Sequence, residues 1–174
     1  IGTNFCEVDI FDEDSWALGT QYWTRRPHKP GYRARFGILL DMVGGSGARF
    51  CRAMFSEYYA SGIVKQVWET DRRLGYGRYF VAQKGGYVTD DHVYVNRYGI
   101  PSVDILACSR DTETGFPPYW HTVDDTMKNI DRAPLTAVVH TVLPVIYEAC
   151  VIKQLLVKIS TKSKTSIYKN RRSL

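Results

Sequence analysis

Short apolar runs separated by amphipathic stretches constrain the fold of this chain more than any other feature. Each run has the length and composition of a buried β-strand, and the runs are Cys6–Phe11, Phe36–Val43, Tyr79–Ala82 and Pro101–Ala107. Stretches with apolar residues at helical spacing predict helices over Trp16–Arg25, Arg52–Leu74 and from about Asp131 to Ile159. This order of strands and helices predicts an α/β layer architecture with a mostly parallel sheet.

The ends and interruptions of the predicted helices follow from individual residues. Asp14 or Ser15 is suited to cap the first helix, because such side chains accept hydrogen bonds from free backbone N–H groups. Gly62 is expected to weaken the middle of the second helix, and Gly75 marks its end. Pro144 is expected to kink or interrupt the last helix, since proline lacks a backbone N–H and its ring collides with the preceding turn.

The basic residues of the chain are concentrated at its C-terminal end. The 174 residues include 23 basic and 18 acidic side chains, which gives a formal charge of +5. Seven of the basic residues and none of the acidic ones fall between Val151 and Leu174, so residues 1–150 carry a net charge of −2. From Ser160 onward Ser, Thr and Lys dominate, which predicts disorder. We therefore expect a globular body over residues 1–150, followed over 151–174 by the end of the last helix and a basic tail.

Composition and motif content exclude several classes of protein. With 44% hydrophobic and 24% charged residues, the chain is expected to be globular and not disordered. No run of eighteen apolar residues is present, so no membrane span is expected. The basic tail has no aromatic residue except Tyr168 between its cations, and no nucleic-acid partner is expected. The sequence contains no P-loop, G-x-S-x-G elbow, H-E-x-x-H helix or G-x-G-x-x-G turn.

The cysteines give little sign of pairing or metal binding. They lie 45, 57 and 42 residues apart, at Cys6, Cys51, Cys108 and Cys150. No C-x-x-C pair occurs, which argues against a zinc ribbon or a redox motif. We predict free, buried thiols rather than disulfides, because free cysteine is among the most buried residue types.

A carboxylate stands at the end of the second apolar run, directly before a glycine turn. Asp41 follows Leu39 and Leu40 and precedes Gly44 and Gly45. Burying an unpaired carboxylate is costly, and functional groups of open α/β sheets gather where strands end. Asp41 is therefore predicted to be functional, and the structural alternative is that it caps the turn.

Two later segments place acids or histidine in loops. Asp90, Asp91 and His92 are adjacent, and two carboxylates beside an imidazole suit proton transfer or the holding of a ligand or a metal-binding group. The alternative is a solvated turn. His121 follows a stretch of aromatic residues and prolines over 116–120, and neutral imidazole is a good zinc ligand. The alternative there is a structural histidine.

The first apolar run ends in three successive acids, Asp12, Glu13 and Asp14. A glutamate in this position suits a general base, and an aspartate suits a hard metal ligand. The alternative is that these acids favour the start of the following helix through its dipole.

Three segments, taken in order, resemble the zinc aminopeptidase-like (M28-type) metallopeptidase superfamily and, within it, bacterial glutaminyl cyclases. The segments are Gly37–Gly44, Thr89–His92 with Gly99–Pro101, and Tyr119–Asp125 with Asn129–Asp131. Each motif alone is weak, but their order and spacing together are specific, and the resemblance spans roughly Phe5 to Glu148. It implies a three-layer α/β/α fold with a mixed, mostly parallel central sheet. It also implies that residues 1–150 are the C-terminal part of a zinc-exopeptidase-like catalytic domain.

The resemblance assigns metal and substrate contacts to four residues. His121 matches the last zinc-binding histidine of the family, and Asp14 matches a zinc-binding acid. Trp120 matches the indole that packs on the substrate, and Phe116 a neighbouring wall of the pocket. A further zinc ligand of the family belongs to a segment upstream of the matched region.

The catalytic residues implied by the resemblance are three carboxylates. Glu13 matches the general base, and Asp91 matches the acid that holds the substrate amine. Asp41 matches an acid that binds a second metal in dizinc aminopeptidases and joins the proton-transfer network in cyclases. The implied reaction is the zinc-dependent conversion of N-terminal Gln of a peptide or protein to pyroglutamate, with release of ammonia. Alternatives are a zinc aminopeptidase of the same fold and a catalytically incomplete member that acts as a binding or structural protein.

The resemblance also implies a cellular setting. Enzymes of this kind are periplasmic or secreted, some of them as lipoproteins, and this is the expected location.

Overall fold

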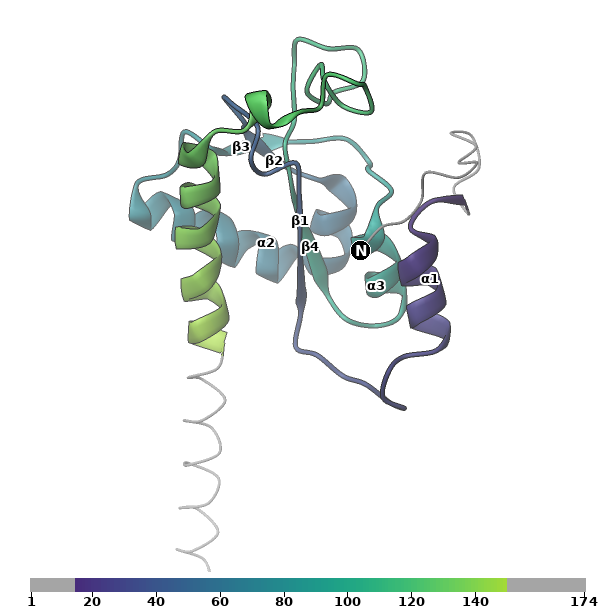
Figure 1. Cartoon of the computed structure of the whole chain (residues 1–174). Helices are drawn as coiled ribbons and strands as arrows, with labels where there is room; N and C mark the ends of the chain where they lie inside the picture. The colour runs from purple at the N-terminus through teal and green to yellow at the C-terminus, as the bar shows by residue number, and fades with distance from the viewer. Residues whose placement is uncertain (1–14, 150–174) are drawn as a thin grey trace, which may run out of the picture.

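The computed structural model describes residues 15–149 of the chain, and Figure 1 shows how its elements are arranged. In order they are α1 (Leu18–Arg25), β1 (Gly37–Asp41), β2 (Phe50–Arg52), α2 (Met54–Leu74), β3 (Phe80–Lys84), α3 (Asp91–Arg97), β4 (Ser102–Leu106), the short 3₁₀ helix η2 (Met127–Asn129) and a helix over 132–149. The predicted strand Cys6–Phe11 and the region 151–174 lie outside the described residues. No helix of the described part is both long and apolar enough to cross a membrane.

The strands form two parallel pairs. β1 pairs with β4 in the register Leu39↔Asp104, so both strands end at the same edge. β2 pairs with β3, and one antiparallel bridge, Phe50↔Ala107, connects β2 to the residue that follows β4. The fold is therefore α/β with parallel strand pairs, as the order of apolar runs predicts.

The core lies between these strands and two long helices. Every residue of β4 is buried, which is typical of a strand covered on both faces. The main members of the core are fully buried aliphatic and aromatic side chains from α2, the strands and the helix over 132–149, namely Phe50, Val64, Val67, Val103, Ile105, Val138 and Val145. In Figure 1 the helix over 132–149 and the pair α1 and α3 lie on opposite sides of β1 and β4.

Several helix details differ from the sequence predictions. Ala17, and not Asp14 or Ser15, is the N-cap of α1, with positive φ and no capping side-chain hydrogen bond. In α2 the non-helical residue is Ala60 and not Gly62, while Gly75 ends the helix as predicted, with φ of 84°. The helix over 132–149 runs through Pro144 without interruption. One lost N–H is tolerated there because Val138, Val142 and Val145 bury that helix in the core.

Besides the three-residue 3₁₀ helix η2, two short elements were not predicted at all. Arg52 belongs to the three-residue strand β2 and not to the start of a helix, and α2 begins two residues later. The seven residues of α3 form a helix capped by Asp90, whose carboxylate accepts a hydrogen bond of 2.6 Å from the backbone N–H of Asp91. Both elements are too short to show a clear hydrophobic period.

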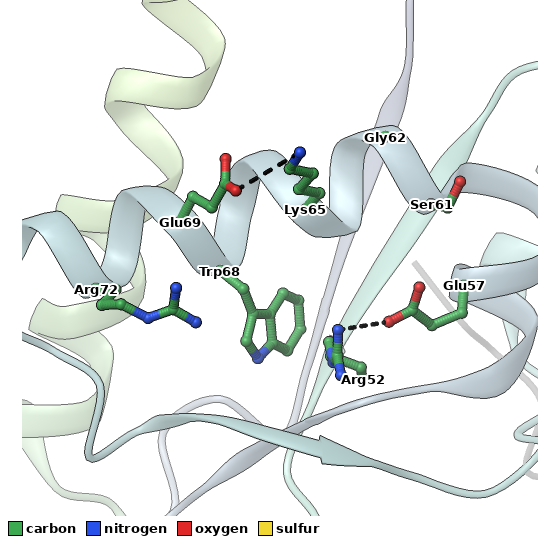
Figure 2. Close-up of a pocket in the computed structure, with 8 residues that line it drawn as sticks. All are labelled: Arg52, Glu57, Ser61, Gly62, Lys65, Trp68, Glu69 and Arg72. Carbon is green, nitrogen blue, oxygen red and sulfur yellow. Dashed lines mark ion pairs between the residues drawn. The ribbon is translucent and has the colours of Figure 1, made fainter.

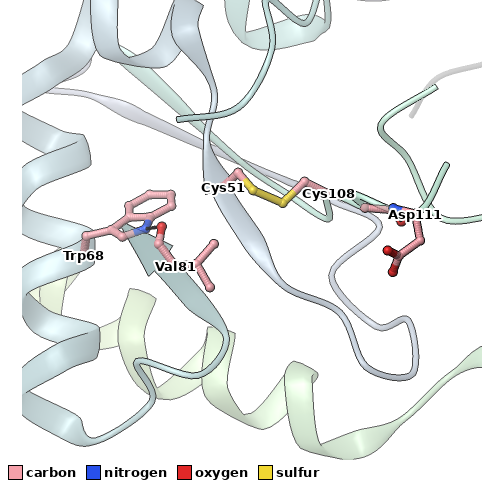
Figure 3. Close-up of a disulfide and its surroundings, with 6 residues drawn as sticks. Cys51, Trp68, Val81, Cys108 and Asp111 are labelled. Atoms are coloured by element: carbon pink, nitrogen blue, oxygen red, sulfur yellow. Dashed lines mark hydrogen bonds between the residues drawn. A yellow bond between two sulfur atoms is a disulfide. The ribbon is translucent and has the colours of Figure 1, made fainter. Parts of the chain in front are cut away.

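The prediction of free thiols is wrong for two of the four cysteines. Cys51 and Cys108 form a disulfide, and their Cα atoms are 6.0 Å apart (Figure 3). The physical reason is the antiparallel bridge Phe50↔Ala107, which brings the two segments side by side, so that the adjacent Cys51 and Cys108 lie within the separation that a disulfide requires. A spacing of 57 residues in the sequence gives no sign of this contact. Cys6 and Cys150 lie outside the described residues.

Candidate active site

Asp41 ends β1 at the edge where β4 also ends. Burial raises the pKa of the Asp41 carboxyl group, although a hydrogen bond from the Met42 backbone and the charge of His121 act in the opposite direction. The charges of Asp91 and Asp125 raise this pKa further. Residues from β1, from α3 and from the loop after β4 therefore lie close enough for their charges to act on Asp41.

The start of α3 supplies two further carboxyl groups, those of Asp90 and Asp91. Burial raises the pKa of Asp90 to about 6, opposed by its hydrogen bond from the Asp91 N–H and reinforced by the charges of Asp41 and Asp91. Asp91 is the first residue of the helix and is only partly buried. The cap thus fixes Asp90 to the backbone and leaves the Asp91 side chain available to a ligand.

Aromatic rings surround the exposed imidazole of His121. The Trp120 indole stacks on it, with ring centroids 4.1 Å apart and an angle of 19° between the planes. Trp16, just before α1, lies parallel to the same imidazole at 6.0 Å. Phe116 contacts the Trp120 ring at 4.6 Å. The rings of Phe116, Trp120 and Trp16 therefore form one aromatic wall beside the histidine.

Backbone contacts hold the loop of His121 against the turn that follows β1. The backbone N–H of Asp131 donates to the Gly44 carbonyl at 2.8 Å, and that of Ser46 donates to the Asn129 carbonyl at 2.7 Å. The Tyr119 hydroxyl group lies where a side chain at Gly45 would be, so the close approach requires glycine. These contacts fix the position of the aromatic wall relative to Asp41.

Backbone strain is concentrated at the same place. Within residues 15–149, the non-glycine residues with positive φ are Ala17, Met42 and His121. Each is a residue of the site or directly follows one, because Ala17 follows Trp16 and Met42 follows Asp41. Unfavourable backbone conformations of this kind cost about 1–3 kcal/mol and cluster at functional sites.

The structure places five of the seven predicted site residues, and these five adjoin one another. Asp41, Asp91 and His121 are linked by their charges, while Trp120 and Phe116 form part of the aromatic wall. Glu13 and Asp14 lie outside the described residues. Within the described part, no three His, Cys, Asp or Glu side chains are placed to hold a metal ion together. His121 is thus the described candidate for a metal ligand.

Sequence reasoning missed two residues of the site. Trp16 falls within a predicted helix, and nothing in the local sequence pattern marks its indole as part of a site. Asp104 stands in the middle of the apolar run of β4, fully buried, and its electrostatic neighbours are Asp90, Asp41 and Asp91. An acid within an apolar run marked Asp41, and the same signal was present at Asp104.

A surface hollow beside α2 contains none of these residues. Figure 2 shows its lining, in which Arg52 pairs with Glu57 at 3.2 Å and Lys65 pairs with Glu69 at 3.8 Å. The charges of these two pairs are compensated within the hollow. Trp68 in its wall donates from Nε1 to the Val81 carbonyl at 2.9 Å and so joins α2 to β3. The hollow is therefore a seam between elements, and the candidate site is the cluster around Asp41 and His121.

Comparison with known proteins places these features in a family. Residues 10–146 match the model of peptidase family M28. A solved glutaminyl cyclase of Porphyromonas gingivalis is 49% identical, with a TM-score of 0.78 over 80% of this chain and 51% of that chain. A solved Zn-dependent exopeptidase of Parabacteroides distasonis is 51% identical, with a TM-score of 0.77 over 80% of this chain and 48% of that chain.

A curated relative also has the name of a glutaminyl cyclase. Bovine glutaminyl-peptide cyclotransferase is 26% identical over 124 residues, which are 63% of this chain and 33% of the bovine protein. The chain thus spans about half the length of the solved relatives named above and a third of the bovine one. Since the family model covers most of the sequence, including β1, the start of α3 and the loop of His121, the chain belongs to peptidase family M28.

Proposed function

We propose that the protein is a zinc-dependent, glutaminyl cyclase-like acyltransferase that converts N-terminal Gln of peptides or proteins to pyroglutamate. The observation that carries this proposal is the convergence of Asp41, Asp91 and His121 beside the stacked Trp120. The glutaminyl cyclase of Porphyromonas gingivalis, at 49% identity, supports it. In this reaction the α-amine nitrogen of the substrate attacks its own γ-amide carbon, and ammonia leaves.

The residues of the site would act mainly by orientation. We assign to Asp91 and Asp41 the holding of the substrate amine, because carboxylates at fixed positions select one approach of the nitrogen. Glu13 would accept the amine proton and return it to the departing ammonia. Trp120 and Phe116 would cover the substrate side chain and exclude water.

His121 and Asp14 are the residues of this chain that would hold zinc. The exposed imidazole of His121, beside the carboxylate of Asp41, suits such a ligand, and the remaining donors would come from outside the described residues. When bound, zinc polarises a carbonyl oxygen as a Lewis acid.

We further propose that residues 1–150 form the C-terminal part of a three-layer α/β/α catalytic domain, in the periplasm or outside the cell. The disulfide Cys51–Cys108 supports that location, because disulfides persist in oxidising compartments. The family match, which ends at residue 146, supports the proposed extent of the domain. The basic segment 151–174 would then be an appendage to it.

A second candidate is a zinc aminopeptidase of the same fold. The identity of 51% to a Zn-dependent exopeptidase favours it. The two activities give different products from a peptide with N-terminal Gln, since an aminopeptidase releases free Gln and a cyclase releases ammonia. A third candidate, a family member without activity that acts as a binding protein, would release neither.

The test is ammonia release from Gln-peptides by the purified protein as it is naturally encoded, with zinc supplied. We expect release by the wild type and a loss of at least about 100-fold in His121→Ala, since metal ligands dominate such sites. His28→Ala is the matched control, because His28 is exposed and accepts a hydrogen bond from Trp23 near the C-terminal end of α1, whereas His121 contacts Trp16 before its start. Free Gln as the product would favour the aminopeptidase, and full activity of His121→Ala would contradict the assignment of His121.

A further inference from the structure

A carboxyl group is buried without a partner in the middle of β4. Asp104 has no exposed surface, and neither of its carboxyl oxygens has a hydrogen-bond partner among the described residues. Its backbone N–H donates to the Ser56 hydroxyl oxygen at 2.9 Å, which fixes the main chain of β4 to α2. The side chain is therefore placed by the fold and points away from water.

The side chain that faces Asp104 is an equally buried histidine on α3. His92 directly follows Asp91, is 1% exposed, and has no hydrogen-bond partner at either ring nitrogen within the described part. Its Nδ1 atom lies 3.6 Å from Oδ2 of Asp104. This separation is longer than a hydrogen bond, and a shift of less than about 1 Å would close it.

The surroundings disfavour a charge on either group. Burial raises the pKa of Asp104 well above its usual range, and the charges of Asp90, Asp41 and Asp91 reinforce this shift. Burial lowers the pKa of His92 to about 4. Both shifts favour the uncharged forms, in which the carboxyl group of Asp104 is a donor and the imidazole of His92 has one nitrogen free to accept.

A neutral pair has a direct use at this site. Asp41 and Asp91 must both be present to hold an amine, and an ionised Asp104 would add another negative charge to the same cluster. A hydrogen bond from Asp104 to His92 also ties the first turn of α3 to β4, which is paired in register with β1. The pair thus connects α3, which carries Asp91, to the strand that is paired with β1, which carries Asp41.

We propose that Asp104 and His92 form a neutral, hydrogen-bonded pair that positions Asp91 against Asp41 for the substrate amine. The pair consists of positioning residues, because neither side chain reaches the surface. The amine-holding role rests on the proposed function, whereas the pair itself and its hold on α3 do not.

Two substitutions at Asp104 separate the hydrogen bond from the volume of the side chain. Asp104→Asn keeps the shape and an N–H donor toward Nδ1 of His92, whereas Asp104→Leu keeps the volume and removes the donor. We expect kcat/KM for a Gln-peptide to stay within about threefold of the wild type in the Asn variant and to fall about 10–100-fold in the Leu variant. Asp71→Leu, at a buried carboxyl group near the far end of α2, is the control and should leave kcat/KM unchanged.

Two measurements on the same proteins need no activity. The ¹⁵N shifts of His92 in the wild type should show a neutral ring from pH 5.5 to 8, and the α3 amides should exchange faster in the Leu variant than in the Asn variant. An imidazolium at pH 7, or equal exchange in both variants, would overturn the pair. Equal kcat/KM in the Leu variant and the wild type would overturn its positioning role. A wild type that releases no ammonia refutes the proposed function, and hydrogen exchange then decides on the pair by itself.

Discussion

Carboxyl groups withdrawn from water recur in this protein, at Asp41, Asp90 and Asp104 near the candidate site and at Asp71 near the end of α2. In each case burial is the largest cause of a raised pKa. A carboxyl group whose pKa is higher in the folded chain than in the unfolded chain favours folding while it is protonated. That contribution is complete below the unfolded pKa and is lost as the pH rises through the folded pKa. Buried carboxyl groups of this kind thus cost stability near neutral pH.

Asp71 allows this cost to be measured away from the site. It is 1% exposed, its carboxyl oxygens have no hydrogen-bond partner among the described residues, and burial raises its pKa from 3.8 to about 6. Ionisation of Asp71 should therefore lower the free energy of unfolding between about pH 4 and pH 7, by up to about 3 kcal/mol. Because Asp71→Asn cannot ionise, we expect it to gain stability over the wild type at pH 8 by about this amount more than at pH 4. Urea unfolding at the two pH values measures the difference.

The control for this experiment is Asp111→Asn, which changes an exposed carboxyl group. Its effect on the free energy of unfolding should be the same at both pH values. A difference for Asp71→Asn that does not depend on pH would show that the pKa of Asp71 is the same in the folded and the unfolded protein, and would contradict a raised pKa.

At the scale of elements, two glycines of α2 can be compared, Gly62 within the helix and Gly75 at its C-cap. Neither Gly62 nor Gly75 has a neighbouring atom within 4 Å of where a Cβ would be, but Gly75 has φ of 84° and Gly62 is helical. Gly62→Ala should raise the free energy of unfolding by about 0.5–1 kcal/mol, because alanine loses less backbone entropy in a helix. Gly75→Ala should lower it by about 1 kcal/mol, because a Cβ disfavours the left-handed conformation.

Thermal unfolding of the two variants under the same conditions tests this pair. Since an added Cβ would meet no neighbouring atom at either position, a change of the same sign in both would contradict the assignment of Gly75 as the left-handed end of α2. The expected difference between the variants is about 1.5–2 kcal/mol.

The elements that the sequence predicts well are those with a long, regular pattern. β1 and β4 lie within the predicted apolar runs, β3 overlaps the run Tyr79–Ala82 and extends beyond it to Lys84, and α1 and α2 lie within the predicted helices. α3 and β2 were not predicted, because their seven and three residues are too few to show a hydrophobic period. Cys6–Phe11 stays a prediction, because it lies outside the described residues.

The same reasoning explains which site residues could be found. Asp41 was predictable because an acid at the end of an apolar run needs an explanation, and His121 because a histidine follows an aromatic loop. The stacking of Trp16 on His121 depends on how α1 packs, and the facing of His92 and Asp104 depends on how α3 packs on β4. Such contacts between distant segments leave no pattern within either segment.

At the scale of the whole molecule, the strands of the described part form two pairs, and a few direct contacts join one pair to the other. Between β2 and the end of β4 these contacts are the bridge Phe50↔Ala107, a hydrogen bond of 2.8 Å from the Cys108 N–H to the Arg49 carbonyl, and the disulfide Cys51–Cys108. Cys108 also begins the loop that carries Phe116, Trp120 and His121. The disulfide therefore connects the pairing of the sheet to the placement of the aromatic wall.

Removing this cross-link should affect both stability and the site. The disulfide closes a loop of 57 residues, and closing such a loop restricts the unfolded chain by about 4 kcal/mol. We expect Cys51→Ala with Cys108→Ala to lower the free energy of unfolding by an amount of this order, measured by urea unfolding. We also expect KM for a Gln-peptide to rise more than kcat falls, because the loop of Trp120 loses one of its two anchors while the hydrogen bonds at Gly44 and Ser46 remain. A reducing agent should reproduce the loss of stability in the wild type and add nothing in the double variant, since the bond is already absent there. If the double variant unfolds at the same urea concentration as the wild type, Cys51 and Cys108 are not paired in the protein, and the aromatic wall is held by the backbone contacts alone.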